Sequence, residues 1–217
     1  MLPDPLENFG QSVVATVFFG NNVLLWLTSG YWELASEFRP LVHTWSLGVE
    51  EQFYVLFPLM VVVLWRFGRS ALFTSVAIVC GFSFASGEVV VFATDPDTSF
   101  YLLPTRAWEL LAGSLCACVH VRHATKPNSM LSLAGLGLIA FAIVSYDGTS
   151  LPGGWALAPV LGAVLVIMFG GADTVTATAL STRGLVGIGL ISYSAYLWHQ
   201  RVDRREQFRA RLRERRP

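Results

Sequence analysis

Two adjacent carboxylates, Glu50 and Glu51, lie inside the mostly apolar segment LVHTWSLGVEEQFYVLFPLM. Residues 47–65 have about the length that a helix needs to cross the ~30 Å hydrocarbon core of a bilayer. A charged side chain at the bilayer centre costs roughly 2.5–3.5 kcal/mol on insertion scales, so such groups usually face a protein interior or a wet cavity. The position of Glu50 and Glu51 therefore indicates a functional site. The alternative is that they lie in the first turn of the helix, where carboxylates are stabilised by the helix dipole and reach interfacial water.

Several polar and aromatic residues surround this pair. Ser46, Glu50 and Tyr54 are four residues apart and share one helix face. His43 has a side chain that can act as a general base near neutral pH, although a lone interfacial histidine is more often structural. We predict that His43, Trp45, Ser46 and Tyr54 contact a substrate.

A second segment with chemical potential is FYLLPTRAWELLAG (100–113). Arg106 and Glu109 are three residues apart and can form an ion pair on one helix face. The pair can bind or orient a charged reactant, or it can be an ordinary interfacial ion pair. Pro104 comes just before it, which suits the start of a helix.

The third segment, ISYSAYLWHQ, ends the last apolar run. It places Tyr193, Tyr196 and His199 near one membrane boundary. Aromatic side chains there are usually belt residues, and the alternative is a set of donors in a site. We predict that Tyr193 and Tyr196 contact substrate and that His199, with Glu50, Glu51, Arg106 and Glu109, belongs to the catalytic set.

The elements that must position these residues are membrane helices. Hydrophobic residues make up 53% of the chain and charged residues 14%. The runs lack the alternation of strands, and a helix satisfies its own backbone in lipid. We predict an all-α, polytopic membrane bundle with about 6–7 spanning helices, on runs at about 11–29, 47–65, 71–93, 105–120, 130–146, 156–172 and 185–199. Gly135, Gly137, Gly184, Gly187 and Gly189 are small residues that can allow close helix approach.

Charges in the connecting segments predict the orientation. The positive-inside rule places loops 66–70, 121–129 and 173–184 in the cytoplasm and loops 30–46, 94–104 and 147–155 outside. All three chemical segments then meet at the outer face. The last 17 residues hold eight of the fifteen basic residues. We predict that this tail, 201–217, is disordered or at most a solvated helix, is not native to the fold, and is separate from a partial domain at 1–200. The alternative is a native tail that stays on the cytoplasmic side because the last apolar segment does not cross.

Other chemistries find no support in the sequence. There is no Gly-x-Ser-x-Gly elbow, no phosphate-binding glycine loop and no metal-spaced set of His and Cys. Cys80, Cys116 and Cys118 fall in apolar segments, which suits buried thiols. We expect no metal, no tightly bound cofactor and no nucleic-acid partner.

The string HTWSLGVEEQFYVLFP (43–58) resembles the signature of the membrane acyltransferase-3 family, and segments 100–113 and 191–199 are similar to two further family segments in the same order. The resemblance implies part of a bundle of about ten helices. It also implies an O-acyltransferase of the bacterial inner membrane. Such an enzyme moves an acyl group, commonly acetyl from acetyl-CoA or another acyl-CoA, to a hydroxyl of a cell-surface glycan such as lipopolysaccharide, exopolysaccharide or peptidoglycan.

The chain departs from that family pattern at both ends. The family's first helix, which carries an Arg and a His, has no match here, and after His199 the Arg-rich tail replaces a further apolar helix. We therefore expect a truncated member that supplies a site wall rather than a complete site. The alternatives are a non-catalytic remnant or a small membrane transporter, although we find no internal repeat to support transport.

Overall fold

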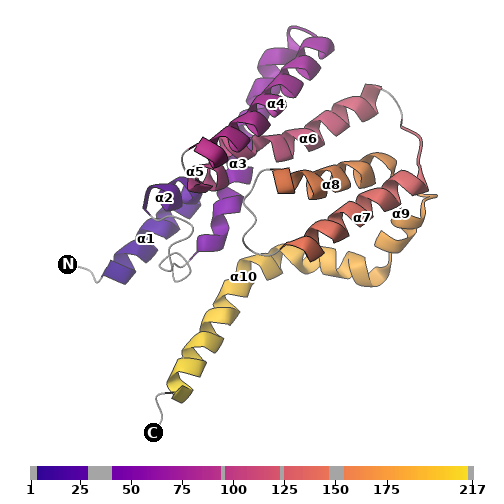
Figure 1. Cartoon of the computed structure of the whole chain (residues 1–217). Helices are drawn as coiled ribbons and strands as arrows, with labels where there is room; N and C mark the ends of the chain where they lie inside the picture. The colour runs from indigo at the N-terminus through magenta and orange to yellow at the C-terminus, as the bar shows by residue number, and fades with distance from the viewer. Residues whose placement is uncertain (1–3, 29–40, 94–95, 123–124, 147–153, 215–217) are drawn as a thin grey trace.

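The computed structural model describes residues 4–28, 41–93, 96–122, 125–146 and 154–214; within these ranges the side chains of residues 4–6, 92–93, 96–97 and 199–214 lie outside the description. Every regular element in this part of the chain is helical, so the all-α prediction is confirmed there (Figure 1). The α-helices are α1 (Asp4–Val17), α2 (Asn21–Thr28), α3 (Trp45–Trp65), α4 (Arg69–Ala93), α5 (Pro96–Tyr101), α6 (Leu103–Arg122), α7 (Ser129–Ser145), α8 (Leu157–Phe169), α9 (Val175–Leu180) and α10 (Arg183–Glu214). Two 3-10 turns, η1 (Val42–Thr44) and η2 (Gly154–Ala156), precede α3 and α8.

The first apolar run, at about 11–29, is not a single helix. The chain turns between α1 and α2, where Phe19 has a left-handed backbone with φ of 56° and the Gly20 amide bonds the Ala15 carbonyl. Two helices of 14 and 8 residues result, and neither is long enough to cross a bilayer alone. The apolar composition of this run concealed the break.

One core is formed where α3, α4 and α6 meet. Phe53, Leu72, Val76 and Leu111 are buried together, with Phe57 and other apolar side chains packed around them. In Figure 1, α3 and α4 run side by side and α6 crosses toward the second half of the molecule. This core fixes the starts of α3 and α6, which carry the first two candidate segments.

The other extensive packing joins α7 to α8, and it depends on glycine. A Cβ on Gly135 would lie 2.6 Å from the Gly162 carbonyl oxygen, and a Cβ on Gly162 would lie 2.7 Å from the Gly135 oxygen. The prediction of close helix approach is thus confirmed at Gly135. It is wrong at Gly137, Gly184, Gly187 and Gly189, where an added Cβ would meet nothing within 4 Å.

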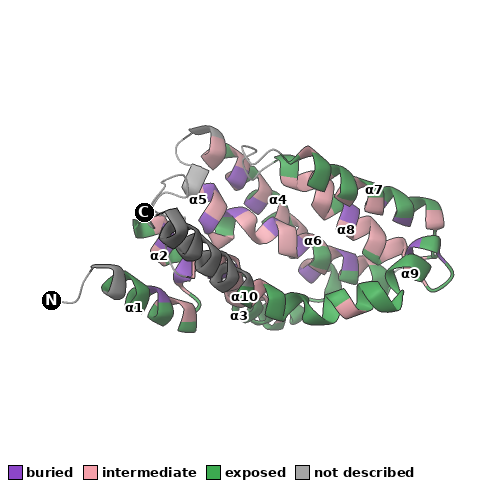
Figure 2. Ribbon diagram, turned by 90° about the horizontal axis from the view of Figure 1, so that it is seen from below, coloured by how far each residue is buried: buried purple, intermediate pink, exposed green. Residues whose placement is uncertain are grey.

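Large apolar side chains cover much of the outer surface. Figure 2 shows that α7, α9 and the first half of α10 are mainly exposed, and the apolar side chains of Leu190 and Val144 are 80% and 85% exposed. In the described residues, two helices are long and apolar enough to cross a membrane, Val42–Trp65 and Arg69–Val91. The count of 6–7 spans is not reached by this measure, because α7 and α8 are shorter and α6 carries charged residues.

The last helix, α10, continues past the predicted end at 199 to Glu214 without a break, and its second half leaves the bundle (Figure 1). The side chains of 199–214 lie outside the described part, so the prediction that the tail packs against nothing stays a prediction. Most of the predicted outer loops 30–46 and 147–155 also lies outside the described residues.

Candidate functional site

The Tyr196 hydroxyl lies at the start of α3, although it is carried by α10. It donates a hydrogen bond to the main-chain carbonyl of His43, and it lies 2.9 Å from the Ser46 hydroxyl. A phenol has one proton to donate, so Ser46 is the donor in the second contact. The His43 ring packs edge-on against Tyr196, with 5.4 Å between ring centroids. The structure therefore brings the first and third candidate segments together.

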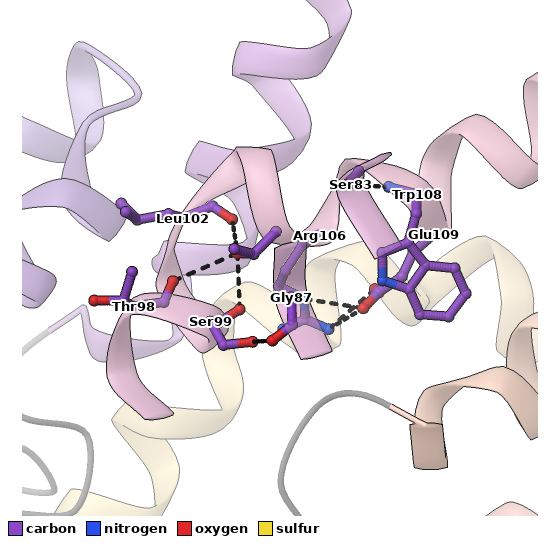
Figure 3. Close-up of polar contacts among 9 residues, drawn as sticks. Ser83, Gly87, Thr98, Ser99, Leu102, Arg106, Trp108 and Glu109 are labelled. Carbon is purple, nitrogen blue, oxygen red and sulfur yellow. Dashed lines mark hydrogen bonds and ion pairs between the residues drawn. The ribbon is translucent and has the colours of Figure 1, made fainter. Parts of the chain in front are cut away.

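Arg106 is held by a carboxylate and by aromatic rings. Its Nε and Nη2 atoms each lie 3.0 Å from an oxygen of Glu109, in a two-bond arrangement drawn in Figure 3. Its guanidinium carbon lies 5.0 Å from the centre of the Trp45 ring and 5.5 Å from that of Phe100. The ion pair predicted from the spacing is confirmed. The ring contacts fix the plane of the guanidinium, which a simple surface pair would leave mobile.

A cavity of about 690 Å³ opens beside this arginine. Its lining comes from four parts of the chain: Trp45, Ser46, Phe100, Arg106, Ala142, Ile143, Tyr146, Trp155, Ala156 and Pro159. Since Glu109 occupies Nε and Nη2, the two N–H groups on Nη1 remain to bind an oxygen of a ligand. A mostly apolar cavity with a few fixed polar groups is the usual form of a small-molecule site.

Two cavity residues were missed by the sequence analysis. Tyr146 follows α7 and Trp155 lies in η2, and their side chains are 63% and 58% exposed. Tyr146 comes just before the predicted outer loop 147–155 and Trp155 is its last residue, so the sequence indicated that both lie at a membrane boundary. The sequence could not predict that they line a cavity with Trp45, because this depends on how α7 and α8 pack.

The start of α6 is fixed by hydroxyl groups around Arg106 (Figure 3). Thr105 donates to the carbonyl of Leu102 at 2.8 Å and lies 3.0 Å from that of Ser99. The Trp108 amide donates to the Ser83 hydroxyl of α4 at 3.0 Å. These buried contacts satisfy amide and hydroxyl groups that lipid cannot, and they set the direction of the first turn of α6.

The start of α3 is fixed by amide side chains that the sequence analysis did not single out. Asn21 donates to the Thr44 hydroxyl at 2.8 Å, and Asn22 donates to the Tyr101 carbonyl at 3.0 Å. Gln52 donates to Asn22 at 2.9 Å. The signal was available, because two asparagines inside an apolar run must find buried partners. These bonds join α2 to both segments that form the cavity.

Glu88 is a further residue that the sequence analysis missed. Its Oε1 atom is buried and has no hydrogen-bond partner in the described part of the chain, and the residue lines a small space with Arg106 and Glu109. The carboxylate sits inside the predicted run 71–93. Like Glu50, it is a carboxylate in an apolar run, where such groups usually face a protein interior or a wet cavity.

The glutamate pair lies near the cavity but does not line it. Glu50 is exposed and close enough to Tyr196 to interact with it electrostatically, whereas Glu51 is half-buried. Neither makes a hydrogen bond or an ion pair with the described residues. Tyr54 and Tyr193 are 58% and 60% exposed and also lie outside the cavity lining. The predicted face shared by Ser46 and Glu50 therefore points toward α10.

The side chain of His199 lies outside the described residues, so its predicted role stays a prediction. Within the described part, no group of three or more His, Cys, Asp and Glu side chains is arranged to hold a metal ion. The cysteines there are free thiols, and Cys116 is buried.

Comparison with known proteins gives one family over nearly the whole chain. The family model described as "Acyltransferase domain" matches residues 8–202. The chain is 27% identical over 213 aligned positions to the peptidoglycan O-acetyltransferase OatA of Listeria monocytogenes, covering 91% of this chain and 34% of the relative. It is 29% identical, over 91% of this chain and 35% of the relative, to the O-acetyltransferase OatA of Staphylococcus aureus strain NCTC 8325. The chain thus spans about a third of the length of these relatives, and no solved structure matches.

Proposed function

Since this chain belongs to the acyltransferase-3 family, we propose that it is the integral-membrane part of an O-acyltransferase. In this proposal it transfers an acyl group, in the simplest case acetyl from cytoplasmic acetyl-CoA whose thioester end reaches the cavity through the helix bundle, to a hydroxyl of a cell-surface glycan. The observation that carries the proposal is the cavity lined by Trp45, Ser46 and Arg106 of the first two family-like segments, with Tyr196 of the third segment hydrogen-bonded to Ser46. The protein would be a multi-pass component of a bacterial inner membrane.

The reaction needs two groups from the protein, a hydrogen-bond donor to the acyl oxygen and a base for the acceptor hydroxyl. The acceptor hydroxyl oxygen bonds to the acyl carbon, its proton goes to a base, the C–S bond breaks, and the thiolate leaves and is protonated. Negative charge develops on the acyl oxygen during the attack, so a fixed donor there lowers the barrier. A base within hydrogen-bond reach of the hydroxyl is also required.

Arg106 is the residue best suited to meet the acyl oxygen. Glu109 and the rings of Trp45 and Phe100 hold its guanidinium in one orientation, so little reorganisation is needed when charge develops. The charge of Glu109 also keeps the ion pair neutral overall before reaction. Glu109 is therefore a positioning residue in this proposal.

In this proposal the acceptor hydroxyl binds beside Tyr196 and Ser46. Ser46 and Tyr196 form a short polar chain beside the cavity, and Glu50 lies close to it. Glu50, Glu51, His43 or His199 would supply the base or orient the acceptor, and Tyr54 and Tyr193 would contact acceptor parts outside the cavity. Trp45, Phe100, Tyr146 and Trp155 present flat apolar rings on which a sugar face can pack.

The name of the Listeria monocytogenes relative points to peptidoglycan as the acceptor to test first. Lipopolysaccharide and exopolysaccharide, which the family resemblance also suggests, are the comparison substrates. Membranes that contain the chain would be given radiolabelled acetyl-CoA with muramyl glycan fragments, and O-acetyl ester would be measured before and after mild alkali. Alkali-labile label on glycan that is lost in Arg106→Gln supports the proposal. Equal labelling by membranes with and without the chain would overturn it.

A further inference from the structure

A second cavity, of about 610 Å³, lies at the other end of α3, α4 and α6. It is lined by Trp65, Arg69, Ser70, Leu72, Phe73, Ala117, Cys118, Val121 and Arg122. These residues end α3, begin α4 and end α6, so none of them is shared with the cavity of the proposed reaction. The positive-inside rule assigns this end to the cytoplasmic side. Its function is independent of the proposed acyl transfer.

The charge in this second cavity is of one sign. Arg69 and Arg122 both lie in the lining, and no acidic residue is among the lining side chains. The Arg69 guanidinium carbon lies 5.8 Å from the centre of the Trp65 ring, which holds that arginine at the edge of the cavity. Arg122 is exposed at the end of α6. Two cations without a carboxylate beside them suit an anionic ligand.

The rest of the lining is apolar. Trp65, Phe73 and Val121 form walls on which an acyl chain can lie, and the Trp65 and Val121 side chains are 56% and 77% exposed. An apolar cavity at membrane depth does not stay empty, because lipid chains surround it. Arginine side chains at the end of such a cavity meet the phosphate level of the cytoplasmic leaflet.

We propose that this cavity is a binding site for an anionic phospholipid of the cytoplasmic leaflet. The phosphate and the anionic headgroup lie between Arg69 and Arg122, and one acyl chain lies along Trp65, Phe73 and Val121. Basic pockets between membrane helices on the cytoplasmic side are a recurrent form of anionic lipid site.

The lining argues against an acyl-CoA in the same place. A CoA headgroup carries adenine, ribose and amide groups that need hydrogen-bond partners once they are buried. Besides the arginines, only Ser70, Cys118 and the indole N–H of Trp65 offer polar side-chain groups in this lining. A phospholipid needs only cations near its phosphate and apolar contacts along its acyl chains.

The test uses the full chain in liposomes made with either brominated phosphatidylglycerol or brominated phosphatidylcholine. Bromine on the acyl chains quenches nearby tryptophan, and the difference between wild type and Trp65→Phe isolates the Trp65 signal from the other tryptophans. We expect the apparent affinity for phosphatidylglycerol to fall about fivefold for each of Arg69→Gln and Arg122→Gln. The double variant Arg69→Lys/Arg122→Lys keeps the charge and should retain most of the preference.

The matched control is Arg183→Gln, which removes one charge, as each glutamine variant does, from the same predicted side but outside the cavity. The proposal predicts that this control keeps the preference for phosphatidylglycerol. Three results overturn the proposal: equal quenching by the two lipids, an equal loss in the control, or displacement of phosphatidylglycerol by a stoichiometric amount of acyl-CoA. Helical content by circular dichroism, measured on every variant, separates lost binding from lost folding. If the glutamine variants do not fold, loss of the phosphatidylglycerol preference in a folded lysine variant overturns the proposal.

Discussion

The two cavities, at opposite ends of α3 and α6, are similar in volume, and they differ in whether their arginines are paired with a carboxylate. The cavity beside Ser46 has one arginine, fixed by Glu109 through two hydrogen bonds and by two aromatic rings. The cavity beside Trp65 has two arginines, and none of its lining residues is acidic. A fixed, neutralised cation suits a site in which charge appears during a reaction, whereas free cations suit a ligand that already carries charge.

The largest expected effect is that of Arg106→Gln on transfer. Loss of one fixed donor to a developing oxyanion lowers rate by about 10²–10³-fold, so we expect a loss of that size in labelled acetyl transfer. Quenching at Trp65 by brominated phosphatidylglycerol should not change. Arg183→Gln is the control for an altered charge elsewhere and should transfer normally. A variant of Arg106 with more than a third of wild-type transfer would contradict the assignment.

The glutamate pair gives the next contrast. Glu50 shares the helix face that carries Ser46 and lies near Tyr196, whereas Glu51 points about 100° away. We expect Glu50→Gln to lower transfer by at least tenfold and Glu51→Gln to have a smaller effect, with both proteins accumulating in membranes. Transfer rates per amount of membrane protein measure this. Full activity of both variants would contradict a catalytic role for the pair and favour the alternative, in which both are structural charges at a helix end.

A smaller effect is expected from Tyr196→Phe. The change keeps the ring against His43 but removes the hydroxyl that joins Ser46 to the main chain, at a cost of about 1 kcal/mol for a hydrogen bond. We expect roughly a tenfold loss of transfer from the misplaced start of α3. Ser192→Ala, on the same helix and exposed, is the control. Equal rates of acetyl transfer for Tyr196→Phe and Ser192→Ala would contradict the assignment of Tyr196 to the site.

The smallest expected effect is on stability, at the wall formed by α7 and α8. In Gly135→Ala the new methyl group meets the Gly162 carbonyl, and overpacking of this kind costs about 1–3 kcal/mol. Gly137→Ala adds the same methyl group where nothing lies within 4 Å, so its melting temperature should match or exceed that of the wild type. Thiol-reactive dye, which reports exposure of buried Cys116 in detergent, follows the unfolding. Equal melting temperatures for both variants would contradict the close approach.

The sequence predicted the helices that carry the site better than the contacts that build it. The helical character of the apolar runs and the Arg106–Glu109 ion pair follow local rules, and the described residues show both, although the first run is divided into two helices. The turn at Phe19 was missed because hydrophobicity does not report backbone direction. The contacts of Trp45 with Phe100 and of Ser46 with Tyr196 join distant segments, so only their common membrane side was predictable. Glu88 was missed although the rule that found Glu50 covered it.

In this proposal the two cavities face opposite sides of the membrane, and the reaction takes place in the outer one. Single cysteines at Tyr146→Cys and Lys126→Cys, in a chain whose three native cysteines are replaced by alanine, test the claim directly with a membrane-impermeant maleimide. In intact spheroplasts we expect labelling at position 146, beside the Ser46 cavity, and labelling at position 126 only after lysis. Labelling at position 126 before lysis, with position 146 protected, would contradict the account.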